Sequence, residues 1–464
     1  MRIRDGEQLS GTEQGAERGT GAVGRVSRRI LGGATLTGAL AVACGGPSSS
    51  ERAGELPKPV TGPMELRVAT NTSIQNMPGW EKAAQGYEAK FPTRKVKLEH
   101  ATGSAYTDRM VSQQAAGDPP PIFYTSTTGI HNFGPKGTFT DLIPLVKADR
   151  AVNLKDIPDR ALKGYTWAGK LYGMPVMADT RYIHYNVNLF KQAGLPMLPK
   201  EWNDDSFTIE KFNDYAQRLT DPAKGIWGFV HGESWPLKAL YQFGADFWDD
   251  RNYTAKCVLD TPGAIESFQW MQDSAHKFRF APASAVATAQ GITSSDNAFL
   301  QGKAAMVLGG YKHTAAIFTA AQGFEWSIAP LPKGRSKGTQ VVVVGFGVPT
   351  GTKHVAEAFD WIKWTTFQDG ACAIMGLASQ AVSDKVERSK CSPLPEWQTK
   401  MTQDGLKSAG KVDADHPNVK PEMWTAINTE VAKLMANEQS APSTAKQITE
   451  QVNALFQPYV VARG

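Results

Sequence analysis

The chain has 464 residues, with 50 Lys and Arg against 45 Asp and Glu, and a formal net charge of +5. This balance gives no argument for nucleic-acid binding, and the sequence has no basic stripe with interleaved aromatic residues. The length suggests two or three domains, and no segment after the N-terminal leader has the roughly 18 apolar residues that a membrane-spanning helix needs.

Residues 1–43 are interpreted as an export signal. The twin arginines Arg28 and Arg29 precede a weakly apolar run that ends directly before Cys44. Twin arginines are an export address in bacteria, and a cysteine after small residues resembles the acylation site of a lipoprotein signal. We therefore expect lipid modification of Cys44 and a place on the extracytoplasmic face of a bacterial cell membrane. The alternative is an ordinary signal peptide with an incidental cysteine. We also expect translation to start further along the sequence, at Val23 or Val26.

From residue 44 to residue 63 the chain is rich in Gly, Ser and Pro, which predicts a flexible tether. Beyond Met64, short apolar runs alternate with segments of helical periodicity. Strands are expected at 66–70, 96–100, 122–124, 182–185, 226–230, 305–308 and 341–344. Helices are expected at 80–91, 106–116, 209–219, 270–280, 356–367 and 423–437. This alternation predicts an α/β fold with a mostly parallel sheet.

Signatures of common enzymes are missing from the sequence. It contains no GxSxG, HExxH, P-loop or dinucleotide-binding motif, and its eight histidines are scattered. The acidic pairs Asp204-Asp205 and Asp249-Asp250 could be drawn as glycosidase carboxylates, but adjacency in sequence says little about the spacing that such catalysis needs across a cleft. We expect neither an enzyme nor a cofactor or metal site.

Three cysteines remain after Cys44, and an exported protein can hold disulfides. Cys372 and Cys391 are close enough in sequence to pair, which would leave Cys257 free. The alternative is that all three are reduced and buried.

Several motifs follow one another in a fixed order. LYGMPVMADTRYIHYNVNLFKQAGL starts at residue 171 and is followed by a Pro-rich loop with Trp202 and by FTIEKFNDYAQRLTDPAKGIWGF. FLQGKAAM then precedes Gly309-Gly310-Tyr311, and IAPLPKG and VGFGVP with AEAFDWIKWTTFQDG come later. Together they resemble extracellular solute-binding proteins of the maltose- and oligosaccharide-binding type, which feed ABC importers.

The resemblance implies a periplasmic-binding-protein-like α/β fold of two lobes with a ligand cleft between them. Three hinge crossings are expected near 174–178, 341–345 and 378–384. The N-terminal lobe would hold 64–176 and 344–380, and the C-terminal lobe 177–343 and 381–464. The implied function is capture of an uncharged sugar or oligosaccharide by a monomer, with hinge closure and delivery to ABC permease subunits. The alternatives are a secreted glycan hydrolase and the same fold binding a non-sugar solute, such as a glycerophosphodiester or a peptide.

The resemblance also places candidate ligand-binding residues. Tyr311 and Trp424 match positions that stack on sugar rings, with a core position as the alternative for each. Asp179 matches a cleft acid that accepts hydroxyl bonds, with a turn or cap as its alternative. The other candidates follow strands or lie at the second crossing: Asn71, Thr72, Ser73, Thr125, Ser126, Thr127, Thr128, His231, Glu233, Trp235, Gly345 and Phe346. Since the candidate residues of the N-terminal lobe carry neutral amide and hydroxyl groups, an uncharged ligand is favoured.

Overall fold

The computed structural model describes most of the chain from residue 57 onward, which includes the last residues of the expected tether. The described residues are 57–71, 77–101, 103–232, 239–248, 256–310, 314, 321, 323–338, 340–375, 380–381, 385–386, 396–408, 411–412 and 421–455. Cys44 and the export signal lie outside them. Within the described part, none of the helices combines the length and apolar character that crossing a membrane requires.

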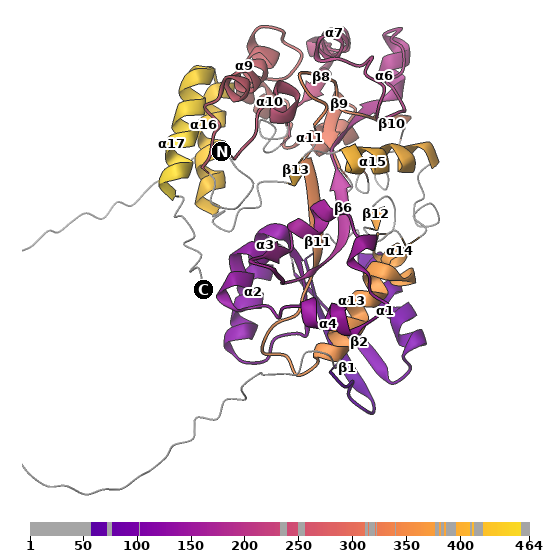
Figure 1. Ribbon diagram of the computed structural model, residues 1–464. Helices are drawn as coiled ribbons and strands as arrows, with labels where there is room; N and C mark the ends of the chain where they lie inside the picture. Colours follow the sequence, from indigo (N-terminus) through magenta and orange to yellow (C-terminus); the bar gives the residue numbers. More distant parts are fainter. Residues whose placement is uncertain are drawn as a thin grey trace, which may run out of the picture. The chain divides into compact units, whose positions relative to one another are not determined.

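The larger of the two main sheets is drawn in the lower half of Figure 1. It has seven strands among the described residues. Its strand order is β12 (Gln380–Ala381), β6 (Met174–Thr180), β11 (Gln340–Gly347), β3 (Ile122–Ser126), β1 (Met64–Asn71) and β2 (Arg94–Ala101), with β13 (Lys411–Val412) paired to β11. Helices α1 (Met77–Lys90), α13 (Val355–Phe367) and α14 (Asp369–Met375) lie on one side of this sheet, and α2 (Gly103–Ala115) and α3 (Thr127–Phe133) on the other.

The smaller sheet has four strands, in the order β10 (Trp326–Ala329), β7 (Tyr182–Asn186), β9 (Ala304–Gly309) and β8 (Trp227–Val230). Its helices include α6 (Val187–Gln192), α7 (Ile209–Arg218), α9 (Pro262–His276), α10 (Ser284–Ala289) and α11 (Ser295–Leu300). The C-terminal pair α16 (Pro421–Met435) and α17 (Ala441–Leu455) packs on α9.

The prediction of a mostly parallel sheet is wrong. Strands β1, β2 and β3 are parallel, as the strand–helix alternation indicates. However, β11 pairs antiparallel with both β3 and β6, and β7 pairs antiparallel with both β9 and β10. These antiparallel strands arise because the chain crosses from the larger sheet to the smaller one and returns. The first strand after each crossing, β7 or β11, therefore runs opposite to the strands named above.

Local sequence explains where several helices begin. Thr208 caps α7, because its hydroxyl accepts a bond from the Lys211 amide at 3.3 Å. The expected helix 270–280 begins earlier, at Pro262, which occupies the first turn. It ends at His276 rather than residue 280, since Arg279 adopts a left-handed φ of 57° that a helix cannot continue.

Each sheet has its own buried apolar core. Around the larger sheet, Trp80 and Trp361 are among the fully buried rings, and around the smaller sheet, Phe212 and Phe229 are. Helix α15 (Glu396–Ser408) contributes to two clusters, since Leu406 joins the larger-sheet core while Met401 packs with Tyr182, Trp202 and Ile328.

The chain passes from the larger to the smaller sheet between β6 and β7, at Arg181, and returns between β10 and β11. The third expected crossing lies mostly outside the described residues, so the lobe boundaries given above stay a prediction. Cys372 is disulfide-bonded, to a partner outside the described residues. Cys257 is free and buried, and burial raises the pKa of its thiol to about 12.

Candidate functional site

Three predicted residues end strands at one edge of the larger sheet. Strands β1, β3 and β6 run in the same direction, because β11 is antiparallel to both β3 and β6. Their carboxyl ends carry Asn71, Ser126 and Asp179. Asn71 and Ser126 are exposed, whereas Asp179 is only 7% exposed. Open α/β sheets bind ligands at this edge.

Some residues at the end of β3 and in the following turn have structural roles. Ser126 caps α3 by accepting a bond from the Gly129 amide at 3.3 Å. Thr127 is 2% exposed, and its methyl group lies close to Gly164. Thr125 is also buried, and its carbonyl accepts a 2.6 Å bond from the Tyr165 hydroxyl. Ser126 is therefore the exposed hydroxyl of these three, and the side chain of Thr128 lies outside the described residues.

Asp179 lies where the two sheets meet. Its Oδ1 accepts a 2.9 Å bond from the Thr180 amide. Its Oδ2 lies 2.5 Å from the point that a Cβ atom on Gly310 would occupy, and the Nη1 atom of Arg181 lies 2.4 Å from the same point. A side chain at Gly310 would therefore displace both charged groups. The structure thus brings Asp179 to the segment that follows β9 and leads directly to Tyr311.

Thr314 holds this segment against β7. Its amide donates to the Gly310 carbonyl at 3.0 Å, and its hydroxyl donates to the same carbonyl at 3.1 Å. Since that donation uses its only proton, the Thr314 oxygen accepts from the Tyr182 hydroxyl at 2.6 Å and from Nε2 of His184 at 2.9 Å. These bonds hold Gly310 and Thr314 to the smaller sheet.

His231 directly follows β8, whose carboxyl end lies beside that of the parallel strand β9. Burial lowers the pKa of His231 to about 3, so the ring is neutral at physiological pH. Its Nε2 lies 2.7 Å from the Ser274 hydroxyl, which itself donates to the Met271 carbonyl at 2.6 Å. Ser274 must then accept from Nε2, which assigns the proton to Nε2 and makes Nδ1 the acceptor nitrogen of the ring.

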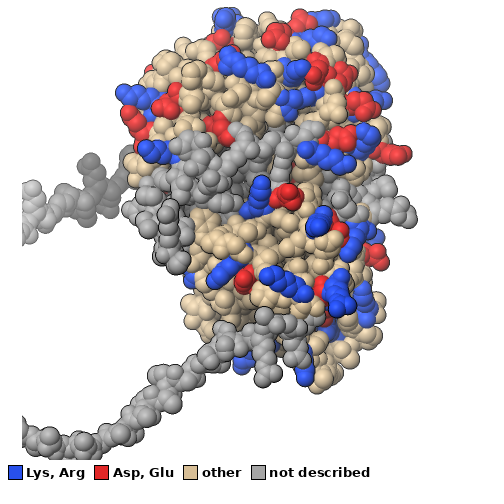
Figure 2. All heavy atoms as spheres, in the orientation of Figure 1, with Lys and Arg blue, Asp and Glu red and all other residues tan. Residues whose placement is uncertain are grey.

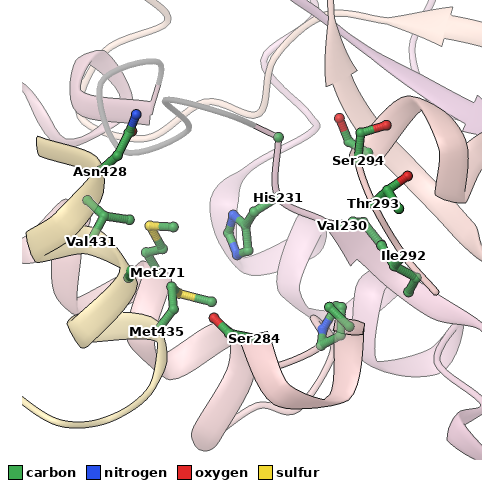
Figure 3. A pocket seen from close by; sticks show the side chains of 15 residues that line it. Val230, His231, Met271, Ser284, Ile292, Thr293, Ser294, Asn428, Val431 and Met435 are labelled. Carbon is green, nitrogen blue, oxygen red and sulfur yellow. The ribbon is translucent and has the colours of Figure 1, made fainter. Parts of the chain in front are cut away.

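A pocket of about 400 Å³ opens beside His231 (Figure 3). Figure 3 shows Asn428, Val431 and Met435 of α16 facing it from one side, with Met271 next to them. Its lining comes from β8 and the following residues, α9, the segment 282–295 and α16: Val230, His231, Gly232, Met271, Pro282, Ser284, Ala287, Ile292, Thr293, Ser294, Ser295, Asn428, Val431, Ala432 and Met435. None of these described residues is charged, which suits an uncharged ligand.

Three further candidates, Gly345, Phe346 and Trp424, are in contact with the core or the backbone of the protein. A Cβ atom on Gly345 would lie 2.1 Å from the Met174 carbonyl, at a bulge between β11 and β6. Phe346 is fully buried and meets Trp80 edge to face at 5.6 Å. Trp424 is partly buried and packs against the core of α16 and α17. Ligand contact by these residues stays a prediction.

Five ligand-binding candidates lie outside the described residues: Thr72, Ser73, Glu233, Trp235 and Tyr311. In the described part of the chain, no group of His, Cys, Asp and Glu side chains could hold a metal ion. On the face in Figure 2, basic and acidic side chains are interspersed around the smaller sheet. Lys191 and Glu325 form an exposed ion pair at 2.6 Å, and exposed pairs of this kind contribute little to stability.

Sequence reasoning missed Arg181 and most of the pocket lining. Arg181 could have been noticed, since it stands two residues after Asp179 and just beyond the crossing predicted near 174–178. The pocket residues could not, because Met271, Ile292 and Asn428 come from separate segments and read as ordinary helix or loop positions.

Comparisons with known proteins agree with this architecture. The family model described as bacterial extracellular solute-binding protein matches residues 71–371. The maltodextrin-binding protein MdxE of Bacillus subtilis is 24% identical over 345 residues, covering 71% of this chain and 76% of that protein. The mannitol-binding protein of Pseudomonas aeruginosa is 23% identical and covers 66% and 72%.

Solved structures show the same two-lobed fold. The ABC substrate-binding protein Lmo0181 of Listeria monocytogenes, in complex with cycloalternan, superposes with a TM-score of 0.72 at 18% identity, over 84% of this chain and 98% of that one. UgpB of Mycobacterium tuberculosis, in complex with glycerophosphocholine, gives 0.69 at 18% identity, over 85% and 99%. The predicted fold class is confirmed, as is the expectation of a binding protein rather than an enzyme. This chain belongs to the bacterial extracellular solute-binding protein family.

Proposed function

We propose that this protein is a lipid-anchored binding protein that captures an uncharged sugar or oligosaccharide outside the cell and delivers it to an ABC importer. The observation that carries the proposal is the position of Asp179. A carboxylate from the larger sheet lies against Gly310, at the end of a strand of the smaller sheet. A ligand bound there would contact groups from both lobes.

The chemistry of the surrounding groups supports a polyhydroxyl ligand. Asp179 can accept two hydroxyl bonds, and bonds to a charged acceptor are the stronger kind. Ser126 and Asn71 add neutral hydroxyl and amide groups at the same sheet edge. Relatives named for maltodextrin and mannitol binding support the same ligand class.

The expected export leader and the family support anchoring and delivery. Acylated Cys44, with the tether 44–63, would hold the lobes at the membrane surface near the permease subunits. Ligand capture would close the lobes by a hinge at the crossings, of which Arg181 is one. Closure would distinguish the loaded protein from the empty one for its membrane partner.

A second candidate ligand is a glycerophosphodiester. Arg181 favours it, because its guanidinium lies beside Gly310 and could pair with a phosphate. UgpB, which gives a similar TM-score, was solved with glycerophosphocholine.

A thermal-shift panel of neutral sugars, polyols, glycerophosphodiesters and peptides separates these ligands. A ligand at one hundred times its Kd should stabilise the protein by about 2.7 kcal/mol. We expect neutral sugars or polyols to give the shift, and calorimetry then supplies the affinity. Small-angle scattering should show a smaller radius of gyration in the complex. A shift with glycerophosphodiesters alone would replace the sugar proposal, and release of reducing ends from a glycan would indicate a hydrolase.

A further inference from the structure

We propose that the pocket of Figure 3 binds an aliphatic group carried by the ligand, such as a short alkyl substituent next to its hydroxyl-bearing part. The inference rests on the proposed function, because it takes the pocket and the Asp179 region as parts of one ligand site. It narrows the ligand class from neutral sugars in general to sugars or polyols that carry an apolar substituent.

The walls of the pocket are mainly apolar. Its apolar lining residues come from all four segments that form it: Val230, Met271, Pro282, Ala287, Ile292, Val431, Ala432 and Met435. Val230, Met271 and Met435 are among its most deeply buried residues, at 3%, 4% and 7% exposure. The hydroxyl and amide groups of Ser284, Thr293, Ser294 and Asn428 belong to exposed residues. The depth of the pocket is therefore mainly apolar, with His231 and the buried Ser295 as polar exceptions among the described lining residues, and its rim is polar.

This lining does not suit a bare sugar ring. None of the described lining residues is Trp, Tyr or Phe, so none of them offers a flat ring for stacking. Hydroxyl groups pushed against Met271, Val431 and Met435 would lose water without gaining partners, which is costly. Methionine side chains are flexible and polarisable and adapt to irregular apolar groups. An alkyl chain can pack against these apolar side chains without burying an unpaired polar group.

The pocket also has the size and the position for such a group. Its volume of about 400 Å³ lies within the range of roughly 300–1,000 Å³ found for ligand pockets. It begins at Val230 and His231, at the end of β8, and the neighbouring strand β9 leads to Gly310 beside Asp179. The hydroxyl-binding edge and the apolar pocket are therefore one strand apart.

The test titrates the protein with n-alkyl glucosides from methyl to hexyl, and with 1-butanol to 1-hexanol as sugar-free probes. Methionine methyl groups labelled with carbon-13 report occupancy, and Met271→Leu and Met435→Leu assign the two pocket signals. We expect these two signals to move among the 13 methionines. Affinity should rise by about fourfold for each added methylene until the pocket is full, as expected for burial of one methylene group.

Two alanines of α10 provide a matched pair of variants. Ala287 lines the pocket, whereas Ala289 is exposed on the same helix and does not. Ala287→Leu should abolish the dependence on chain length, and Ala289→Leu should leave it unchanged. Affinity independent of chain length in the wild type, or pocket methyl signals unmoved by either series, would overturn the inference. If alkanols move these signals while no sugar or polyol binds, the pocket binds an aliphatic group, but the ligand is not a sugar or polyol and the proposed function fails.

Discussion

Acid should weaken the fold through His184, a buried residue of β7. Its ring is fully buried between Tyr182 and Trp326, and its Nε2 bonds to Thr314 at 2.9 Å. Burial lowers its pKa from 6.5 to about 3, so the folded protein keeps the ring neutral. The unfolded chain takes up a proton near pH 6.5. The stability that neutral His184 contributes is therefore complete above pH 6.5 and is lost as the pH falls towards 3.

The size of the effect follows from the two pKa values. One bound proton changes the free energy of unfolding by about 1.4 kcal/mol per pH unit. Between pH 7.5 and pH 5, His184 should therefore remove about 2 kcal/mol. His231, whose pKa is also lowered to about 3, adds a loss of the same sign. Carboxyl groups with lowered pKa values, such as Glu99 with an ordinary value of 4.5, act mainly below this window.

The measurement is urea unfolding at several pH values, followed by tryptophan fluorescence. In His184→Gln, the free energy of unfolding should fall between pH 7.5 and pH 5 by about 2 kcal/mol less than in the wild type. His231→Gln should flatten the profile by a similar amount. The two effects should add, because His184 lies in β7 and His231 follows β8, and β9 separates these two strands. Parallel pH profiles for wild type and His184→Gln would refute the reasoning, whatever the absolute stability of the variant.

Three further predictions concern the site and the anchor. Asp179→Asn should keep the fold but change the ranking of ligands, with a loss of about 1.5 kcal/mol, or tenfold in affinity, for those that bind its carboxylate; an unchanged ranking by calorimetry would remove Asp179 from the site. Gly310→Ala should lower ligand affinity by about tenfold or more, because its Cβ would displace Asp179. Gly351→Ala is the control, since its nearest neighbour would lie 3.7 Å away, and equal affinities for the two variants would contradict the argument. Mass spectrometry of membrane-extracted protein should find acylated Cys44, and a Cys44→Ala protein that stays membrane-bound would disprove the anchor.

Much of the secondary structure could be read from periodicity. Strands β1, β2, β3, β7 and β9 and helices α7, α13 and α16 lie within a few residues of their predicted positions. These elements are set by local alternation of apolar residues, by caps such as Thr208, and by turns. The exception is α9, where a first-turn proline placed the start eight residues before the expected one.

The family also followed from sequence, because its motifs keep their order along the chain. The residues that lie beside each motif in the folded protein could not be read from the sequence. A Cβ atom on Gly310 would lie 2.5 Å from Oδ2 of Asp179, yet the two residues are far apart in the chain. Only the pairing of β7 with β9 places them side by side, since Tyr182 is opposite Gly309.

The apolar pocket was likewise decided by tertiary structure alone. Periodicity tells which face of a helix is apolar, but not whether a neighbouring segment covers that face or leaves a space beside it. Met271, Ile292 and Val431 each have ordinary apolar positions in their own segments. They line one pocket because α9, α16 and the segment that precedes α11 all pack around the end of β8. Such packing depends on contacts between residues distant in sequence.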